Sequence, residues 1–302
     1  MTLLIVGSVA LDTIQTPSGS VENAVGGSAV YASYAASLFT QPAIVGVVGE
    51  DFPKQEITNL RRRGVRTEGL EIVRGGKTFR WGGRYGDDIN QRETLFTELN
   101  VFQDFAPKLP KGYHDIPNVF LANIDPDLQI DVLGQMRKPR VVVCDTMNLW
   151  IKTKLASLTK LMNRINVLLL NDEEARMLAD TPSLAKAASK LRGSGIDRLI
   201  IKKGEHGSMM FSSEGTFAAP ALSLPMVKDP TGAGDTSAGG MLGWLAGRTL
   251  TEVNWRKAIL VGTAMASFCV EDFSVGRMRD LEKGDLARRT TELRAMMSVG
   301  RV

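Results

Sequence analysis

The chain is poor in the residues that build covalent or metal-held frameworks. Its 302 residues include only two cysteines and two histidines. Cys144 and Cys269 lie far apart within apolar segments, so we expect two buried thiols in a reducing compartment and no disulfide framework. A zinc site of histidine and cysteine ligands cannot be assembled from so few of them.

Long apolar runs and an excess of one charge are also missing. No run approaches the roughly 20 apolar residues of a membrane-spanning helix, and the opening MTLLIVGSVALD lacks the basic start of a signal peptide. Lys and Arg number 37 against 33 Asp and Glu, and the only dense basic cluster is at residues 61–63. Nucleic-acid binders usually carry a basic patch with interleaved aromatics. We therefore expect a cytoplasmic protein with no nucleic-acid or membrane partner.

What the sequence does contain is a regular alternation of short apolar segments with helical stretches. The apolar segments are rich in Val, Ile and Leu and are followed by Gly or by a polar residue; they are residues 3–6, 43–48, 119–122, 141–144, 167–170 and 199–201. Continuous apolar runs of this length indicate strands that are buried on both faces. The alternation predicts an α/β fold with a doubly wound, mostly parallel sheet.

Polar side chains follow four of these predicted strands. Asn123, Asp145, Asn171 and Lys202 each come directly after an apolar segment. The carboxyl ends of the strands line the ligand crevice in doubly wound sheets. We therefore expect these four side chains to lie near one another.

Residues 70–100 interrupt the alternation with short segments rich in Thr, Arg, Phe, Trp and Tyr. Together with residues 12–21 they predict a small antiparallel sheet inserted into one α/β domain of residues 1–302. Its half-polar, aromatic faces suit a lid or an interface, and its exposed edge could pair with a second copy to form a homodimer. Arg80, Trp81 and Arg84 are further candidate ligand contacts on this lid, with outward solvation of the two arginines as the favoured alternative.

The most specific local pattern is Asp229-Pro-Thr-Gly-Ala-Gly-Asp235, which precedes a helical stretch. Gly232 and Gly234 let backbone N–H groups approach a ligand closely, and the positive end of the following helix points at the same place. Such a turn binds phosphate. Asp235 lies in the first helical turn beside this anion site, where a carboxylate can accept a proton. Alternatively, it only complements the helix dipole.

This string resembles, position for position, the second signature of the PfkB (ribokinase-like) family of carbohydrate and nucleoside kinases. Further similarities follow in the order of the family's elements, from residue 2 to about residue 276; they are GSVALD at 7–12, GGSA at 26–29, GVVGED at 46–51, NDEE at 171–174 and KKGEHG at 202–207. The resemblance implies a ribokinase-like kinase with ATP and Mg²⁺ as cofactors. It would transfer the γ-phosphoryl group to a primary hydroxyl of a sugar or sugar-like small molecule.

The resemblance also assigns roles near the phosphates. Asp235 would be the catalytic base, and the backbone N–H groups of Gly232, Ala233 and Gly234 would stabilise the transferring group. The residues implied for nucleotide binding are Asn171, Lys202, Gly204, Gly207 and Thr231. Glu174 would hold magnesium through water, and Asp229 would lie near a monovalent cation such as K⁺. Taken alone, Asn171 and the acids that follow it would be read as a helix N-cap.

On the acceptor side the resemblance implies a group of substrate-binding residues, namely Asp12, Gly26, Gly27, Ser28, Asn123 and Asp125. Two departures lie here: Tyr31 stands where the family's first signature has Asn, and Ser28 stands where ribokinase has Lys. The identity of the sugar is therefore open. A nucleoside kinase is the alternative, because the lid aromatics can stack on a base as readily as on a sugar face. A non-catalytic sugar- or nucleotide-sensing protein on the same fold is the alternative from another class.

Overall fold

The computed structural model describes residues 2–298, and its largest element is a nine-stranded sheet in the order β13-β12-β11-β10-β9-β8-β1-β4-β5. Its strands are β1 (Leu3–Val6), β4 (Pro42–Gly49), β5 (Arg66–Val73), β8 (Asn118–Leu121), β9 (Val141–Asp145), β10 (Val167–Asn171), β11 (Arg198–Lys202), β12 (Ser208–Ser212) and β13 (Gly215–Ala219). Neighbours from β11 to β5 run parallel, and β12 and β13 add an antiparallel end. The prediction of a doubly wound, mostly parallel sheet is confirmed.

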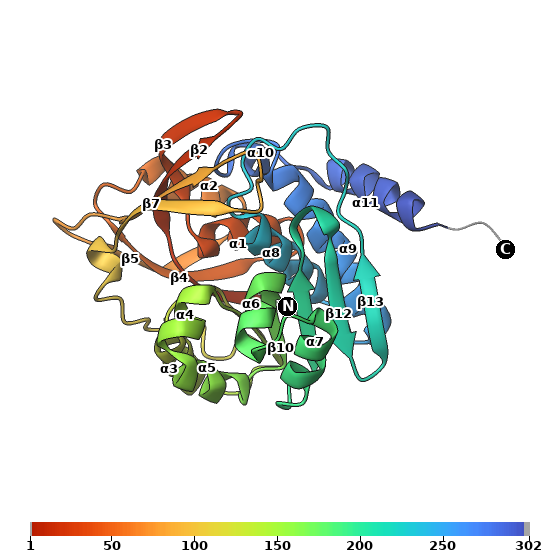
Figure 1. The fold of residues 1–302 in the computed structure, drawn as a ribbon. Helices are drawn as coiled ribbons and strands as arrows, with labels where there is room; N and C mark the ends of the chain where they lie inside the picture. The colour runs from red at the N-terminus through yellow and green to blue at the C-terminus, as the bar shows by residue number, and fades with distance from the viewer. Residues whose placement is uncertain (1, 299–302) are drawn as a thin grey trace.

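Helices cover both faces of this sheet, and alternate residues of one strand point into separate cores. Leu3 and Ile5 of β1 pack in one core, whereas Leu4 and Val6 pack in the other, because successive side chains of a strand face opposite sides. The helices of the first core are α1 (Ser28–Ser37), α2 (Lys54–Arg62), α8 (Ala233–Leu245), α9 (Glu252–Cys269), α10 (Gly276–Arg279) and α11 (Lys283–Met297). Those of the second, in the lower part of Figure 1, are α3 (Pro126–Gln135), α4 (Asn148–Thr153), α5 (Leu155–Met162), α6 (Asp172–Ala179) and α7 (Leu184–Arg192).

A four-stranded sheet stands apart from the large one, at the upper left of Figure 1, in the order β3-β2-β6-β7. Its strands are β2 (Ala10–Thr16), β3 (Gly19–Gly26), β6 (Phe79–Tyr85) and β7 (Arg92–Glu98). The sheet is mixed and not antiparallel as expected, because β2 and β6 run parallel while only the hairpin neighbours run antiparallel. A long connection through α1, β4, α2 and β5 separates β2 from β6, and such connections permit parallel pairing.

The boundaries of the small sheet also differ from the expected ranges of 12–21 and 70–100. Residues 70–73 belong to β5, which pairs with β4 at the edge of the large sheet. An edge strand is covered less completely than a central one, and β5 mixes buried, half-buried and exposed positions. That pattern resembles a lid strand, which is why the sequence did not separate the two.

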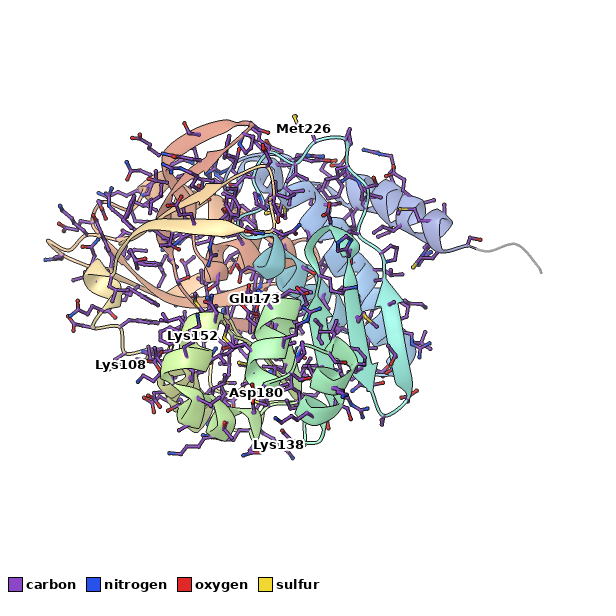
Figure 2. The ribbon with its side chains drawn as sticks, in the orientation of Figure 1. Lys108, Lys138, Lys152, Glu173, Asp180 and Met226 are labelled. Carbon is purple, nitrogen blue, oxygen red and sulfur yellow. The ribbon has the colours of Figure 1, made fainter. Side chains whose placement is uncertain are left out.

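The outer surface over the second group of helices carries mixed charge. Figure 2 shows Lys108, Lys138 and Lys152 on the same side of the molecule as Glu173 and Asp180, and all five are exposed. Within residues 2–298, none of the helices has both the length and the apolar character that a membrane crossing requires.

Candidate active site

The N-terminus of α8 begins at a turn that only glycine accommodates. Gly232 caps the helix with φ 77°, and a Cβ atom there would lie 2.5 Å from the ring of Tyr31. No side chain of a preceding residue caps the first turn of α8. The N–H of Ala233 donates to the carbonyl oxygen of Pro230 at 3.3 Å and that of Asp235 to its own carboxylate, which leaves the N–H of Gly234 without an intrahelical partner. Helix N-termini with unpaired N–H groups attract anions. The turn can therefore hold a phosphoryl group.

Asp235 lies in this first turn, next to the predicted anion site. Burial raises the pKa of its carboxyl to about 7, with a further upward contribution from Asp145 and a downward one from Lys202. A base works best when its pKa lies near the working pH. Asp235 is thus placed and tuned to accept a proton at neutral pH.

Lys202 brings a positive charge to the same place from the end of β11. Its Nζ lies 2.6 Å from Oδ2 of Asp145, whose side chain is 4% exposed, and a Cβ on Gly234 would lie 3.1 Å from that Nζ. Burial lowers the pKa of Lys202, but Asp145 and Glu174 outweigh burial and raise it. The lysine therefore stays charged at the start of α8, where it can neutralise phosphate.

Asn171 and Glu174 form a capping box at the start of α6. The backbone N–H of Glu174 donates to Oδ1 of Asn171 at 2.7 Å, and the N–H of Asn171 donates to Oε2 of Glu174 at 2.7 Å. The helix-cap interpretation therefore holds locally. Burial raises the pKa of Glu174 to about 7, Lys202 lowers it, and Asp145 raises it further.

The carboxylates around Lys202 fit a magnesium ion that takes its other ligands from water and phosphate. They do not fit a metal that is held by protein side chains alone. Asp145 and Glu174 supply carboxylate oxygens, which magnesium prefers, while it usually keeps waters and substrate phosphates as its other ligands. Over residues 2–298 no group of three or more His, Cys, Asp or Glu side chains is arranged to hold a metal by itself. These residues fit an ion that is bound mainly by nucleotide phosphates.

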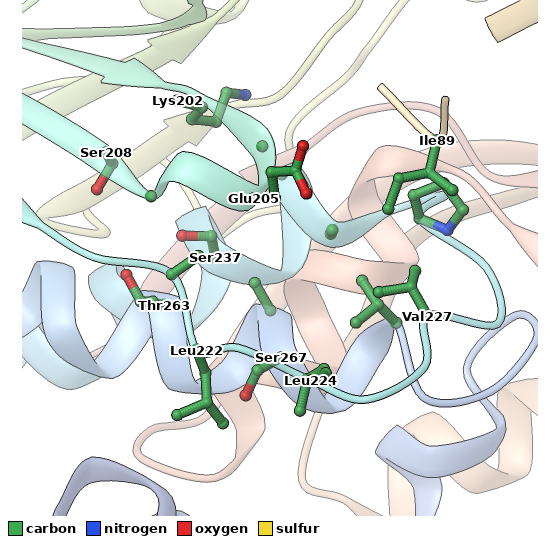
Figure 3. A pocket seen from close by; sticks show the side chains of 18 of the residues that line it. Ile89, Lys202, Glu205, Ser208, Leu222, Leu224, Val227, Ser237, Thr263 and Ser267 are labelled. Atoms are coloured by element: carbon green, nitrogen blue, oxygen red, sulfur yellow. The ribbon is translucent and has the colours of Figure 1, made fainter. Parts of the chain in front are cut away.

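A cavity of about 510 Å³ opens beside α8, within the range of about 300–1,000 Å³ typical of ligand sites. Lys202, Gly204 and Gly207 line it, as the sequence predicts for a nucleotide loop. Figure 3 shows Lys202 and Leu224 on opposite sides of the cavity. Gly207 has φ 81°, and a Cβ there would lie 2.0 Å from the carbonyl oxygen of Ala219. Only glycine can make this close approach at the mouth of the cavity.

Asp12 of β2 is a second buried carboxylate that interacts electrostatically with Asp235, and it lies against the backbone of two glycines. A Cβ on Gly26 would come within 1.9 Å of Oδ2 of Asp12, and the N–H of Gly27 donates a hydrogen bond to this carboxylate. Asp12 is 5% exposed, and burial raises its pKa to about 8, with smaller contributions from Asp229 and Asp235. A buried carboxylate that receives so few hydrogen bonds from the protein can bind the hydroxyls of a substrate strongly.

Three residues expected on the substrate side have other partners. The hydroxyl of Ser28 lies 3.2 Å from that of Ser8 and accepts the backbone N–H of Ser8 at 3.1 Å. Asn123 accepts the indole N–H of Trp150 at 2.9 Å. Asp125 caps α3 and pairs with Lys154 at 3.3 Å, so its carboxylate does not join the cluster.

Asp229 and Thr231 hold the turn that precedes α8. Oδ1 of Asp229 accepts the N–H of Thr231 at 2.8 Å, and the Asp229 side chain is buried. Oγ1 of Thr231 lies 3.1 Å from the hydroxyl of Tyr85, on β6 of the small sheet. The small sheet therefore touches the turn that forms the anion site.

The two lid arginines named as candidate ligand contacts both pair with acids. Arg80 pairs with Asp51 at 2.9 Å, and Arg84 is 53% exposed and pairs with Glu93 at 3.3 Å, so outward solvation describes Arg84. Arg92, which the sequence did not single out, lies directly opposite Tyr85 in the β6–β7 pair. Knowing the hairpin register would have revealed it, because facing residues of paired strands share one side of the sheet.

Known kinases resemble this chain in sequence and in fold. The chain is 29% identical over 260 residues to cytidine kinase of Thermococcus kodakarensis. The aligned stretch covers 83% of this chain and 91% of that relative. Nucleoside kinase of Burkholderia thailandensis in complex with inosine has the same fold, with a TM-score of 0.78 and 21% identity. The alignment covers 96% of this chain and 97% of that one. A fructokinase double mutant of Vibrio cholerae, bound to fructose, ADP and potassium ion, also has a TM-score of 0.78, with 15% identity and coverage of 96% and 98%.

A family model described as pfkB family carbohydrate kinase matches residues 130–281, a stretch that includes Asn171, Lys202 and the turn before α8. The match extends over half of the chain. This chain belongs to the pfkB family of carbohydrate kinases.

Proposed function

We propose that this kinase transfers the γ-phosphoryl group of ATP to the primary hydroxyl of a nucleoside. The observation that carries the proposal is the position of Asp235. It lies in the first turn of α8, whose first two residues line the nucleotide cavity together with Lys202, and it is close enough to Lys202 and Asp12 for their charges to interact. The long similarity to a cytidine kinase supports a nucleoside as the acceptor. A free sugar is the second candidate, favoured by the fructose-bound relative of the same fold.

In the proposed reaction the acceptor hydroxyl oxygen attacks the γ-phosphorus and forms a new O–P bond. The bond between that phosphorus and the bridging oxygen breaks, its electron pair remains on the β-phosphate of ADP, and the hydroxyl proton passes to the Asp235 carboxylate. The N–H groups at the start of α8 and Lys202 stabilise the negative charge on the phosphoryl group. Asp12 holds two hydroxyls of the ribose and so orients the acceptor.

Magnesium, bound near Glu174 and Asp145, would screen the charge of the donor phosphates. A monovalent cation such as K⁺ fits the neighbourhood of Asp229, whose pKa is raised by burial. The fructokinase double mutant of Vibrio cholerae binds a potassium ion in its own structure.

The small sheet would act as a lid over the acceptor. Tyr85 ties it to Thr231 in the turn before α8, so closure would place its inner face next to the reacting groups. Lids of this kind exclude water and limit wasteful hydrolysis of ATP. The edge strand β7 carries Phe96, which is 38% exposed, and this supports pairing of two lids in a homodimer.

The proposal is tested with purified protein, ATP and Mg²⁺ against a panel of nucleosides, pentoses, hexoses and their phosphates. We expect ADP release with one or more nucleosides and a product whose mass is that of the nucleoside monophosphate. Turnover of sugars alone would establish the second candidate. Tight ligand binding without turnover across the panel would indicate a sensing protein and contradict both.

Replacing Glu174 by Gln should raise the magnesium concentration needed for half-maximal rate, by about tenfold at most, because one charge is lost from an ion site that phosphates dominate. Gln still serves in a capping box, so the melting temperature should change little. The measurement is a magnesium titration of the rate. The matched control is Glu173→Gln, which changes an exposed acid in the same helical turn. If the Glu174→Gln and wild-type titrations superimpose, Glu174 is only a helix-capping residue.

A further inference from the structure

The β6–β7 hairpin is fastened to the active-site turn at its β6 end. Tyr85, the last residue of β6, lies within hydrogen-bond distance of Thr231 in the turn before α8. Arg92, the first residue of β7, is the cross-strand partner of Tyr85 in the antiparallel register. The register therefore places Arg92 beside the turn that forms the anion site.

The tip of the same hairpin rests on the nucleotide cavity. Ile89 and Asn90 line the cavity, and Ile89 is labelled among its walls in Figure 3. Nδ2 of Asn90 lies 3.4 Å from Oε1 of Glu205, and a Cβ on Gly204 would come within 2.1 Å of the Asn90 side-chain oxygen. The hairpin thus contacts both the nucleotide loop and the anion-site turn. Arg92 comes two residues after Asn90 in the chain and lies opposite Tyr85 in the strand pair.

The guanidinium of Arg92 has an aromatic support but no acidic partner. Its central carbon lies 5.0 Å from the centre of the Trp81 ring, a distance at which a cation is attracted to the ring face. Among residues 2–298 no carboxylate lies within 4.0 Å of it, whereas Arg80 and Arg84 on the same sheet each pair with an acid. Arg92 is therefore a cation held in place by the Trp81 ring and by a side-chain hydrogen bond to Tyr85, and its remaining hydrogen-bond donors meet no acid in the described part of the chain.

The charge of Arg92 is directed at the reaction centre. Its positive charge lowers the pKa values of Asp12, Glu174 and Asp235, three carboxylates that surround the anion site from separate elements, although burial is the largest influence on each. Lys202 is already paired with Asp145 there. A phosphoryl group that enters this acidic surrounding gains from a cation in addition to Lys202 and magnesium, and Arg92 supplies a positive charge that is close enough to act on all three carboxylates.

We propose that Arg92 is a catalytic residue that contacts the γ-phosphoryl group of the donor and stabilises its negative charge during transfer. The planar guanidinium offers a fork of N–H donors that matches two phosphate oxygens, and phosphoryl transfer depends mainly on such charge stabilisation. Arg92 neither takes nor gives a proton, so the bonds formed and broken are those of the reaction above. This inference rests on the proposed kinase function but not on the identity of the acceptor.

The test compares binding of ADP with binding of AMP-PNP, an ATP analogue that carries a γ-phosphoryl group, by isothermal titration calorimetry with Mg²⁺ and no acceptor. In Arg92→Gln the Kd of AMP-PNP should rise about tenfold or more, as expected for loss of a charge-assisted hydrogen bond. The Kd of ADP should stay within about twofold of wild type, since ADP lacks the contacted group. Arg92→Lys should weaken AMP-PNP binding less, because it keeps the charge but loses the fork.

The matched control is Arg84→Gln, which removes an exposed arginine of the same hairpin and should leave both affinities unchanged. If Arg92→Gln leaves the two affinities unchanged, or weakens ADP and AMP-PNP equally, Arg92 only supports Trp81 and the proposal is overturned. Because no acceptor is present, a failure of the nucleoside assignment would show in the substrate panel and leave this result intact.

Discussion

Replacing Asp235 by Asn should lower kcat by about 10²–10⁴, the usual effect of removing a general base. The carboxylate lies in the first turn of α8, and its raised pKa of about 7 gives it a proton affinity suited to accepting the hydroxyl proton. The KM for ATP should change little, because backbone N–H groups, Lys202 and magnesium hold the phosphates. Steady-state kinetics with saturating acceptor provides the measurement.

The pH profile distinguishes this role from a helix-dipole effect. The base acts in its unprotonated form, so kcat/KM for the acceptor should fall as the pH drops below about 7 and level off above it. Asp12 and Glu174 titrate in the same range, and comparison with Asp235→Asn isolates the contribution of Asp235. A folded Asp235→Asn protein that keeps more than about a tenth of the wild-type kcat, a barrier change of less than about 1.4 kcal/mol, would remove the base from the mechanism.

Replacing Asp12 by Asn should lower kcat/KM for the acceptor by about 10²-fold, the loss expected when a hydrogen bond to a buried charge disappears. Asp12 is 5% exposed and receives the N–H of Gly27, so its other lone pairs are available to substrate hydroxyls. The KM for ATP should remain near wild type. The protein should not become less stable above the raised pKa of Asp12, because the change removes a charge that Asp229 and Asp235 repel.

A 2′-deoxynucleoside provides the control for this assignment. If Asp12 binds the ribose hydroxyls, the loss on mutation should be much smaller with the deoxy acceptor than with the ribonucleoside, since part of the interaction is already absent. The measurement is kcat/KM for both acceptors with both proteins. If the mutation lowers kcat/KM by the same factor with both acceptors, Asp12 does not contact the 2′-hydroxyl.

Residues that act through local backbone geometry could be predicted from the sequence. Gly232 and Asp235 are specified by a turn and the helix that follows it, and Lys202 is specified by its place at the end of an apolar strand. Asp125 shows the limit of this approach. It follows β8 closely, as a crevice residue should, but its carboxylate caps α3 and pairs with Lys154. Sequence position predicts that a side chain is near the crevice edge, not which way it turns.

Residues that depend on pairing between segments could not be predicted. Arg92 becomes visible only when the register sets it opposite Tyr85 and Tyr85 meets Thr231, which lies far along the chain. The end of β5 was placed in the lid for the same reason, since its partner β4 precedes it by a whole helix. A register shift of one residue would turn every side chain of β7 to the other face.

The sequence by itself determined the parallel α/β core and the glycine turn before α8. Continuous apolar segments require cover on both faces, and Gly232 of the turn has a positive φ, a conformation that few other residues adopt. The tertiary structure alone decided the chemistry of the acids. Asp12, Glu174 and Asp235 have ordinary carboxyl groups, and their raised pKa values arise first from burial and then from neighbouring acids, which are Asp229 and Asp235 for Asp12 and Asp145 for the other two, while Lys202 lowers the pKa of Glu174 and Asp235. Burial and charge proximity are properties of contacts between distant segments, which no local pattern contains.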